Sequence, residues 1–322
     1  MNIGIIGFGS IGERHMLNIQ ELYPQMKIDI LTKRKDIKDS KNICILSSAS
    51  EFYKKQHDIY FITNETHKHA DTILRCLQNR PRGIFIEKPL SNTLKGMEII
   101  KKEVRRQKTN FFVAYCLQFF TPLIFLKKLI QKEEIGDVFF IRVSAGKDLR
   151  TWRSGDYKKH YSSDRQKGGG VILDLIHEIN YPAWLLNEKI RLAKGLTTKI
   201  SHLQLKCEDI TEGIFLSKSG KIISIHQDYL QVPGRRYCEI LGTKGTLIWD
   251  KMLIRNSVEN EIKIHTAKKS KVIKIKAGGN DMYQKELQFF IQKVRKNKGY
   301  SNLDEAMQDM KNALALQRLY KK

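Results

Sequence analysis

Residues 1–12 read MNIGIIGFGSIG, an apolar run that passes directly into the spacing Gly-x-Gly-x-x-Gly. The β-branched residues before the glycines predict a buried parallel strand, and a helical pattern with Ile11, Leu17 and Leu22 follows. In such a turn the first glycine makes the bend, the second admits a pyrophosphate, and the third lets helix and strand pack closely. The helix N-terminus would hold the phosphates, so we predict a dinucleotide-binding site. Its residues are Gly7, Phe8, Gly9, Ser10, Ile11 and Gly12.

Strand and helix patterns alternate through the first 120 residues. After the opening strand, further strands are expected at 27–31, 43–46, 58–63, 83–87 and 111–115. This alternation predicts a doubly wound parallel sheet of the Rossmann type with right-handed crossovers. Ligands of such sheets bind outside the carboxyl ends of the strands, so the residues that follow each strand are the candidates for a site.

The residues after the second strand bear on the choice of cofactor. Thr32, Lys33 and Arg34 stand where an acidic residue usually holds the adenosine ribose. A hydroxyl followed by two cations suits a 2′-phosphate better than a 2′-hydroxyl group. The stretch favours NADP over NAD, although Lys33 and Arg34 fit a solvated loop equally well.

Two polar segments follow the fourth and fifth strands. They are Thr-Asn-Glu-Thr-His at 63–67 and Glu-Lys-Pro at 87–89. Proline disfavours the helical region for the residue before it, so Lys88 is expected to be extended with its side chain available to the ligand crevice. The residues predicted to line the cofactor site here are Thr63, Asn64, His67, Glu87 and Lys88.

Beyond residue 136 the alternation of strand and helix patterns ends. A strand is expected at 137–147, an irregular aromatic and basic loop at 148–167, and an antiparallel meander at 189–276. Two amphipathic helices close the chain. We therefore expect a Rossmann domain at 1–120 and a second α/β domain at 121–322 with a largely antiparallel open sheet. An apolar open face needs a cover, and a second copy of the chain is the simplest one, which predicts a homodimer or homotetramer.

A polar cluster lies in the second domain, after three consecutive glycines at 168–170. Its members are Asp174, His177, Glu178 and Tyr181, spaced so that a helix would place them on one face. An ordinary solvated face would show the same pattern, but the glycine turn in front favours a face turned towards a ligand. The preceding loop adds further candidates for substrate contacts, since such loops are often functional. These are Trp152, Arg153 and Tyr157.

Composition narrows the class of partner. The chain has 322 residues, of which 41% are hydrophobic, and 58 Lys plus Arg against 34 Asp plus Glu give a formal net charge of +24. Such a charge suits nucleic acid, an anionic membrane or a phosphorylated substrate. The basic residues are scattered, however, without an aromatic-studded stripe or a helix-turn-helix pattern, so no nucleic-acid partner is expected.

Membrane insertion and metal binding are not indicated either. The uncharged stretch at 109–126 is interrupted by Pro122, which with Thr121 as N-cap predicts a helix start, not a membrane span. The five cysteines lie far apart without a C-x-x-C pair, as in proteins of a reducing compartment. No secretory signal pattern precedes the first strand, so a cytoplasmic location is expected.

Together these motifs resemble the Gfo/Idh/MocA family of NAD(P)-dependent sugar oxidoreductases over essentially the whole chain. The resemblance rests on the glycine turn, the Thr-Asn-x-x-His segment at 63–67, Glu-Lys-Pro at 87–89, and Gly-Gly-x-x-x-Asp ending at Asp174 followed by a histidine. It implies a Rossmann domain, a C-terminal α/β domain whose open sheet often mediates oligomers, and Lys88, Asp174 and His177 facing the nicotinamide and the sugar.

One departure from the family pattern leaves the acid/base residue open. The family usually spaces the aspartate and the histidine by four, whereas here His177 is at plus three and Glu178 at plus four. The Trp-Arg pair at 152–153 and the run Asp-Leu-Ile-His-Glu are similar to members that act in bacterial surface-sugar pathways.

The leading hypothesis is an oxidoreductase that transfers a hydride between a nicotinamide and a carbinol or ketone carbon of a sugar, nucleotide sugar or sugar phosphate. His177 is the natural proton acceptor, because an imidazole titrates near neutral pH. Lys88 would polarise the carbonyl oxygen or relay the proton, and Asp174 would orient the imidazole or bind a sugar hydroxyl. The alternative is a dinucleotide-binding sensor or scaffold without chemistry, which would not need these acid/base residues. A nucleic-acid binder would instead show salt-dependent binding of mixed-sequence DNA.

Overall fold

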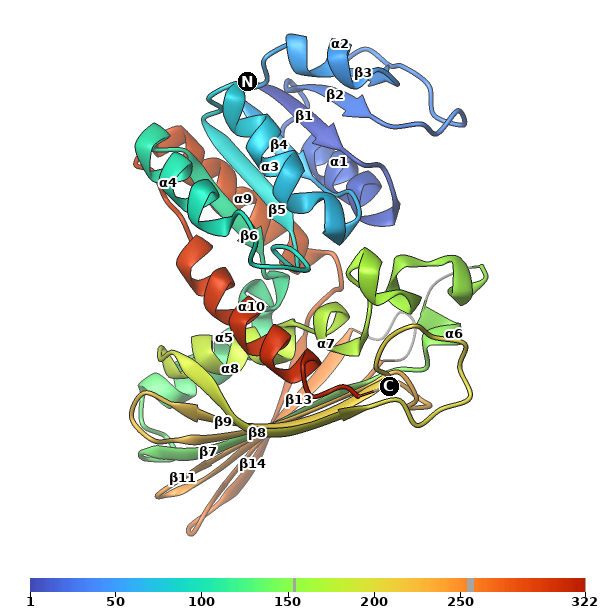
Figure 1. Cartoon of the computed structure of the whole chain (residues 1–322). Coiled ribbons are helices and arrows are strands. Elements are labelled where there is room, and N and C mark those ends of the chain that lie inside the picture. The colour runs from blue at the N-terminus through green and yellow to red at the C-terminus, as the bar shows by residue number, and fades with distance from the viewer. Residues whose placement is uncertain (153–154, 254–257, 322) are drawn as a thin grey trace. The chain divides into compact units, whose positions relative to one another are not determined.

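A computed structural model describes residues 1–152, 155–253 and 258–321 (Figure 1). The chain divides into two compact units. The first comprises residues 1–115 together with 283–310, and the second comprises residues 116–282 together with 311–322.

The first unit is built on six parallel strands in the order β3-β2-β1-β4-β5-β6. Their bounds are Asn2–Ile6 (β1), Lys27–Leu31 (β2), Ile43–Leu46 (β3), Ile59–Ile62 (β4), Gly83–Glu87 (β5) and Asn110–Ala114 (β6). The predicted doubly wound sheet is confirmed, with strand ends that differ by at most one residue. The order reverses beside β1, which lies between β2 and β4, so the carboxyl end of β1 is the place where such sheets bind ligands.

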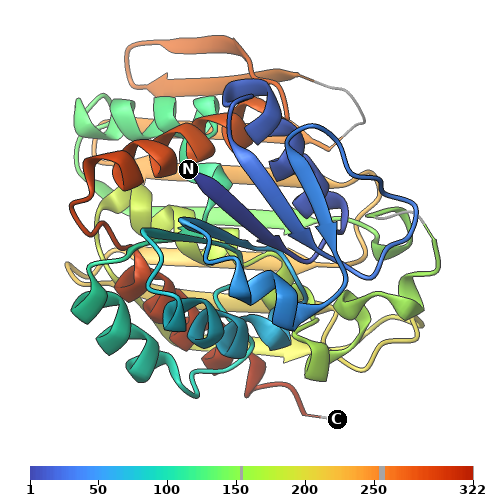
Figure 2. The same ribbon diagram turned by 90° about the horizontal axis from the view of Figure 1, so that it is seen from above.

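Helices cover both faces of this sheet. They are α1 (Ser10–Leu22), α2 (Ala49–Lys54), α3 (His69–Gln78), α4 (Met97–Gln107) and α9 (Asp281–Lys296), with the short 3-10 helix η1 (Thr66–Lys68) before α3. Helices α1 and α9 lie on one face, and α3 and α4 on the other (Figure 2). The buried side of α1 consists of Gly12, His15, Asn18 and Ile19, whereas Leu17 is 53% exposed. The apolar pattern was therefore a poor guide to which side of α1 is buried.

The chain returns to the first unit near its end. Phe290 on α9 lies 6.0 Å from Phe61, 5.4 Å from Phe85 and 5.9 Å from Phe112, measured between ring centroids. Asn302, just before α10 (Leu303–Gln317), bonds both the N–H and the carbonyl of Val113, at 2.8 and 3.0 Å. The predicted boundary at residue 120 assigns residues 283–310 to the second domain. In the structure they belong to the first unit and complete the core on one side of its sheet.

The second unit contains an eight-stranded sheet in the order β14-β13-β12-β11-β7-β10-β9-β8. The bounds are Val138–Gly146 (β7), Ile190–Thr198 (β8), Ile210–Ser217 (β9), Ile222–Asp228 (β10), Arg235–Gly242 (β11), Gly245–Met252 (β12), Glu259–Thr266 (β13) and Ser270–Lys276 (β14). The largely antiparallel sheet is confirmed, but it is not one meander. Strand β7 lies between β10, to which it is parallel, and β11, so it separates two meanders.

The helices of the second unit pack on one face of this sheet (Figure 1). The main ones are α5 (Thr121–Gln131) and α8 (His177–Leu186). Pro122 is in the first turn of α5 as expected, but the N-cap is Phe120 and not Thr121. The shorter elements are η2 (Cys116–Phe119), α6 (Leu149–Trp152), η3 (Tyr157–Lys159), η4 (Tyr161–Ser163), η5 (Arg165–Lys167) and α7 (Val171–Asp174). No helix in the described ranges combines the length and apolar composition needed to cross a membrane.

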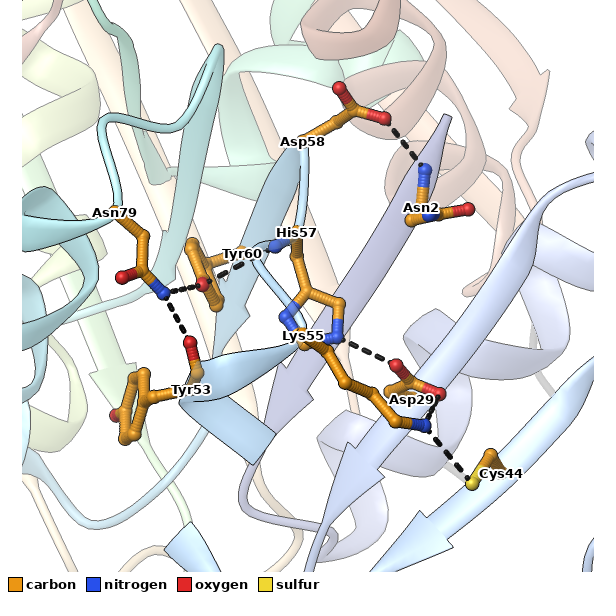
Figure 3. Close-up of polar contacts among 9 residues, drawn as sticks. All are labelled: Asn2, Asp29, Cys44, Tyr53, Lys55, His57, Asp58, Tyr60 and Asn79. Atoms are coloured by element: carbon orange, nitrogen blue, oxygen red, sulfur yellow. Dashed lines mark hydrogen bonds and ion pairs between the residues drawn. The ribbon is translucent and has the colours of Figure 1, made fainter. Parts of the chain in front are cut away.

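Polar contacts tie the strands of the first unit together away from their carboxyl ends (Figure 3). Asp58, just before β4, accepts a hydrogen bond of 2.8 Å from the backbone N–H of Asn2 at the start of β1. Asp29 on β2 contacts His57 at 2.8 Å and Lys55 at 3.1 Å. These contacts link β1, β2 and the segment before β4 at positions away from the carboxyl edge.

Candidate active site

The glycine turn has the geometry that a dinucleotide requires. Gly7 has φ +89°, and a Cβ atom there would lie 2.6 Å from the backbone of Asn64. A Cβ atom on Gly12 would lie 2.6 Å from the carbonyl oxygen of Gly7, whereas one on Gly9 would meet nothing within 4 Å. Gly9 is also the N-cap of α1 and supplies no side-chain bond to the first turn. The first amides of α1 therefore adjoin open space, and the turn fits a pyrophosphate.

The segment after β4 supports this turn. The Thr63 hydroxyl donates to the carbonyl oxygens of Gly7 at 2.6 Å and Ile6 at 3.2 Å, so it fixes the backbone at the start of the turn. The Asn64 amide donates to the Thr72 hydroxyl at 2.9 Å.

His67 is exposed, whereas His69 is buried and connects two loops of the carboxyl edge. The His69 nitrogens lie 2.9 Å from the carbonyl oxygens of Asn64 and Pro89. Sequence reasoning missed His69. The signal that could have found it is its helical spacing with Thr72, Ile73 and Cys76, the buried side of α3.

The residues after β2 bring one cation to the glycine turn. Arg34 donates from Nη1 to the Phe8 carbonyl oxygen at 3.1 Å, and its backbone N–H donates to the Thr32 hydroxyl at 3.2 Å. The same guanidinium bonds Asp36 and lies 3.6 Å from a Glu13 oxygen. Its hydrogen bonds lower the pKa of the Asp36 carboxyl. Arg34 is thus beside the turn, and two carboxylates compete for it. Lys33 is exposed.

Lys88 follows the last residue of β5. It is half-buried, and its peptide bond to Pro89 is cis. The neighbouring Glu87 carboxylate lies 2.7 Å from Nε2 of His15 on α1. Lys88 therefore extends from a strand end that is anchored on both sides, by the Glu87 side chain and by the Pro89 carbonyl oxygen at His69.

In the second unit, the helix expected after the glycines is interrupted. Helix α7 ends at Asp174 and α8 begins at His177, because Leu175 has φ −102° and ψ 29°. Gly170 at the start of α7 has φ +106°, and a Cβ atom there would lie 2.2 Å from Oε1 of Glu208. Every residue from 168 to 182 is buried, so the polar residues of this cluster do not form a solvated helix face. The break instead places Asp174 and His177 at two helix ends.

Asp174 is held by a residue that sequence reasoning missed. Its Oδ2 accepts a hydrogen bond of 2.7 Å from the hydroxyl of Tyr229, whose pKa is raised well above its usual value by burial. Tyr229 also contacts the Trp152 ring edge-on at 5.6 Å, which brings that loop residue near Asp174. The Tyr157 hydroxyl accepts from the Gln204 N–H at 3.1 Å. Arg153 lies outside the described residues.

His177 and Glu178 have different surroundings. Nε2 of His177 lies 3.6 Å from Sγ of Cys116. Glu178 is fully buried, and its Oε1 lies 2.9 Å from Nε of Arg236 on β11. A buried carboxylate must be paired to stay charged, and Arg236 supplies that pair within the unit. Arg236 is, after His69 and Tyr229, the third residue that sequence reasoning missed.

The first unit therefore has the fold and the phosphate turn of a dinucleotide-binding domain, and the second unit holds a buried acid and base. Residues 1–115 match the family described as "Oxidoreductase family, NAD-binding Rossmann fold", and residues 124–248 match the "GFO/IDH/MocA C-terminal domain". The chain belongs to this GFO/IDH/MocA family and is an NAD(P)-dependent oxidoreductase.

Relatives with assigned activities are distant. An inositol 2-dehydrogenase/D-chiro-inositol 3-dehydrogenase of Shouchella clausii is 24% identical over 77% of this chain and 71% of its own. An inositol 2-dehydrogenase of Klebsiella pneumoniae is 23% identical over 92% of this chain and 86% of its own.

A solved structure of a 3-ketoreductase from Actinomadura kijaniata, in complex with NADP and TDP-benzene, has a TM-score of 0.84 at 14% identity and covers 100% of this chain and 98% of its own. A myo-inositol 2-dehydrogenase from Lactobacillus plantarum has a TM-score of 0.80 at 18% identity, with 99% and 96% covered. These likenesses confirm the predicted fold class, a Rossmann sheet plus a largely antiparallel sheet with helices.

Proposed function

We propose that the protein transfers a hydride between the nicotinamide of NAD(P) and a carbinol carbon of a sugar, nucleotide sugar or sugar phosphate. The observation that supports the proposal is the break between α7 and α8, which puts Asp174 at the end of one helix and His177 at the start of the next, in a chain with a dinucleotide turn. Two relatives named above are inositol dehydrogenases, and one neighbouring structure is that of a 3-ketoreductase in complex with NADP and TDP-benzene. The finer proposal is a nucleotide sugar of bacterial surface-glycan synthesis.

The bound nicotinamide would supply the hydride chemistry, and the residues of this chain would handle the proton. His177 takes the hydroxyl proton as the carbon loses its hydride, since an imidazole has a suitable pKa for a general base. Lys88 stabilises the developing charge on the same oxygen with its ammonium group. Asp174, fixed by Tyr229, orients the substrate or the imidazole.

A thermal-shift screen followed by turnover assays tests the proposed function. The protein is saturated with NADP or NAD and exposed to myo-inositol, UDP- and TDP-sugars, and hexose phosphates. A ligand at 100 times its Kd stabilises the folded state by roughly 2.7 kcal/mol. A shift with one of these compounds, together with absorbance change at 340 nm, supports the proposal. Tight cofactor binding without turnover of any compound would favour the sensor or scaffold alternative.

The cofactor preference gives a first prediction. NADP should bind more tightly than NAD, because Arg34 lies beside the turn and no carboxylate follows β2 at Thr32. Isothermal titration with both cofactors measures the two Kd values. The Arg34→Ala variant should lose the difference, and Thr32→Asp should reverse it, whereas Lys38→Ala in the following loop serves as the control. Tighter binding of NAD would show that Asp36 and Glu13 neutralise Arg34.

Assembly gives a second prediction. The helices of the second unit cover one face of its sheet, and the other face carries apolar side chains at paired positions. Phe140 is opposite both Ile222 and Leu241, and Ile222 is 42% exposed. Ion pairs such as Arg142 with Glu239 lie on the same face. Such a mixed surface suits a second copy of the chain, so we propose a dimer or tetramer.

Light scattering at micromolar concentration should therefore give at least twice the mass of one chain. Phe140→Glu should shift the protein towards the monomer, because it places a charge between the apolar side chains of Ile222 and Leu241 on the uncovered face. Lys102→Gln, an exposed change of the same charge on α4, is the control. A monomeric wild-type protein would contradict the prediction.

A further inference from the structure

A buried glutamine contacts the break between α7 and α8 directly. Gln227 is the second-last residue of β10 and is fully buried. Its side-chain nitrogen Nε2 donates a hydrogen bond of 2.5 Å to the carbonyl oxygen of Leu175, the residue at which the two helices are interrupted. Both residues belong to the second unit. The side chain of Gln227 therefore bonds the backbone that separates the two helices.

The backbone hydrogen bonds around the break differ from those of a continuous helix. In an uninterrupted α-helix the Leu175 carbonyl would accept the N–H of Ile179, four residues further on. Here the Ile179 N–H bonds the carbonyl of Ile176 at 3.1 Å, and the Leu175 carbonyl accepts the N–H of Glu178 at 3.0 Å. The second bond to Leu175 comes from Gln227. The glutamine amide therefore stands at this carbonyl in place of the helical N–H group.

The chain just beyond Gln227 holds the neighbouring residue of the break. The hydroxyl of Tyr229 bonds Asp174, and the amide of Gln227 bonds Leu175, which is the next residue. Strand β10 is paired on both sides, in parallel with β7 and antiparallel with β9. Two consecutive residues of the break are therefore fixed to one strand that has neighbours on both sides.

The bond of Gln227 is a poor way to stabilise the fold as such. Among the described residues, the Oε1 atom of this buried side chain has no hydrogen-bond partner. A buried amide oxygen without a partner costs folding free energy, which offsets what the Nε2 bond contributes. A methionine is about as long and would fill the same space without that cost. The chemistry therefore favours a role in holding Leu175 over a purely stabilising role.

We propose that Gln227 is a positioning residue, whose side-chain amide holds the Leu175 carbonyl and thereby maintains the break that separates Asp174 from His177. Helix α8 begins at His177, two residues beyond Leu175, so a change in the backbone at the break moves one helix end relative to the other. If the helix closed, the two residues would lie about one turn apart on a single helix. The inference rests on the proposed function only for the use of Asp174 and His177 in hydride transfer.

The structure of a variant tests the positioning and needs no substrate. Gln227→Met removes the donor at nearly constant length. Asn312→Leu is the matched control, because Asn312 is another buried amide of the second unit that donates to a backbone carbonyl, that of Ile190 at 3.0 Å. Crystal structures of the full-length wild type and both variants with NADP are compared. The torsion angles of Leu175 and the hydrogen bond of Asp174 are measured.

In Gln227→Met the Leu175 carbonyl should bond the Ile179 N–H, so that α7 and α8 join into one helix and Asp174 loses its hydrogen bond. The wild type and Asn312→Leu should keep the break. An unchanged break in Gln227→Met would overturn the proposal, because the local sequence alone would then produce the interruption.

Kinetics gives a second readout. The kcat of Gln227→Met should fall by about 10-fold or more, because a small misplacement of reacting groups is costly, while the Kd of NADP stays within about three-fold. Asn312→Leu should leave kcat unchanged. It should lower the Tm further than Gln227→Met does, because both polar atoms of Asn312 are bonded.

A near-isosteric variant tests the hydrogen bond itself. Gln227→Glu can donate to Leu175 only as a neutral acid, so its kcat relative to the wild type should fall as the pH rises. At its best pH this variant should exceed Gln227→Met by about five-fold or more. A Gln227→Glu variant that is no more active than Gln227→Met at any pH would contradict the proposal.

His177→Ala separates this inference from the proposed function. If the helix closes in Gln227→Met while His177→Ala turns over substrate normally, Gln227 positions the break but the reaction does not use His177. If no compound is turned over, the proposed function fails, and the torsion angles of Leu175 in Gln227→Met still decide whether Gln227 maintains the break.

Discussion

Replacing Lys88 with alanine should lower kcat by at least about 100-fold, the usual scale of acid/base and charge-stabilising groups. The residue is half-buried at the carboxyl end of β5, where a ligand of a doubly wound sheet is expected. Its ammonium group would be lost while the glycine turn and its phosphate-binding amides stay intact. The Kd of NADP should therefore remain within about three-fold of the wild-type value.

Steady-state kinetics with the best substrate of the panel, together with cofactor titration, measure the two effects separately. Lys95→Ala, an exposed lysine in the following loop, should behave like the wild type. A near-normal kcat for Lys88→Ala would mean that this lysine is an ordinary loop residue.

His177→Ala should lower kcat by a similar factor of about 100 or more, because the hydroxyl proton then has no acceptor. The pH dependence of kcat/KM should also lose the limb that reports an imidazole. Cofactor affinity should change little, since His177 belongs to the second unit and the phosphate turn to the first.

The Glu178→Gln variant tests whether Glu178, in place of His177, is the base. The structure places this buried carboxylate against the half-buried Arg236, so its loss should leave that guanidinium unpaired and cost at most roughly 3 kcal/mol of folding free energy. The variant should therefore show a lower Tm but a nearly normal kcat per folded molecule. If His177→Ala keeps its kcat while folded Glu178→Gln loses it, Glu178 is the base.

Much of the first unit could be predicted from the sequence because its signals are local. Alternating apolar runs and glycines fix the strands and the turn at Gly7, and steric contacts there admit no other residue. The inward side of α1 could not be predicted. It carries His15 and Asn18, whereas Leu17 points outward, because a helix face that buries hydrogen-bonded polar groups has the composition of a solvated one.

In the second unit, the order of the strands in the sheet could not be predicted from the sequence. Each of its strands has a recognisable pattern, but the pattern does not encode which strands are neighbours, so the insertion of β7 between β10 and β11 could not be foreseen. The residues that bind Asp174 and Glu178 come from strands that are distant in the sequence. Tyr229 follows β10 and Arg236 is on β11, and only the folded sheet brings them to Asp174 and Glu178.

The return of α9 to the first unit affects how the chain folds during synthesis. Phe61, Phe85 and Phe112 pack against Phe290, which the ribosome adds only after residues 116–282 of the second unit. At roughly 5–20 residues per second, this aromatic surface stays uncovered for about ten seconds or longer while the nascent chain grows. The protein cannot complete its nucleotide-binding unit first, and a chaperone that shields this surface during translation would raise the yield of native protein.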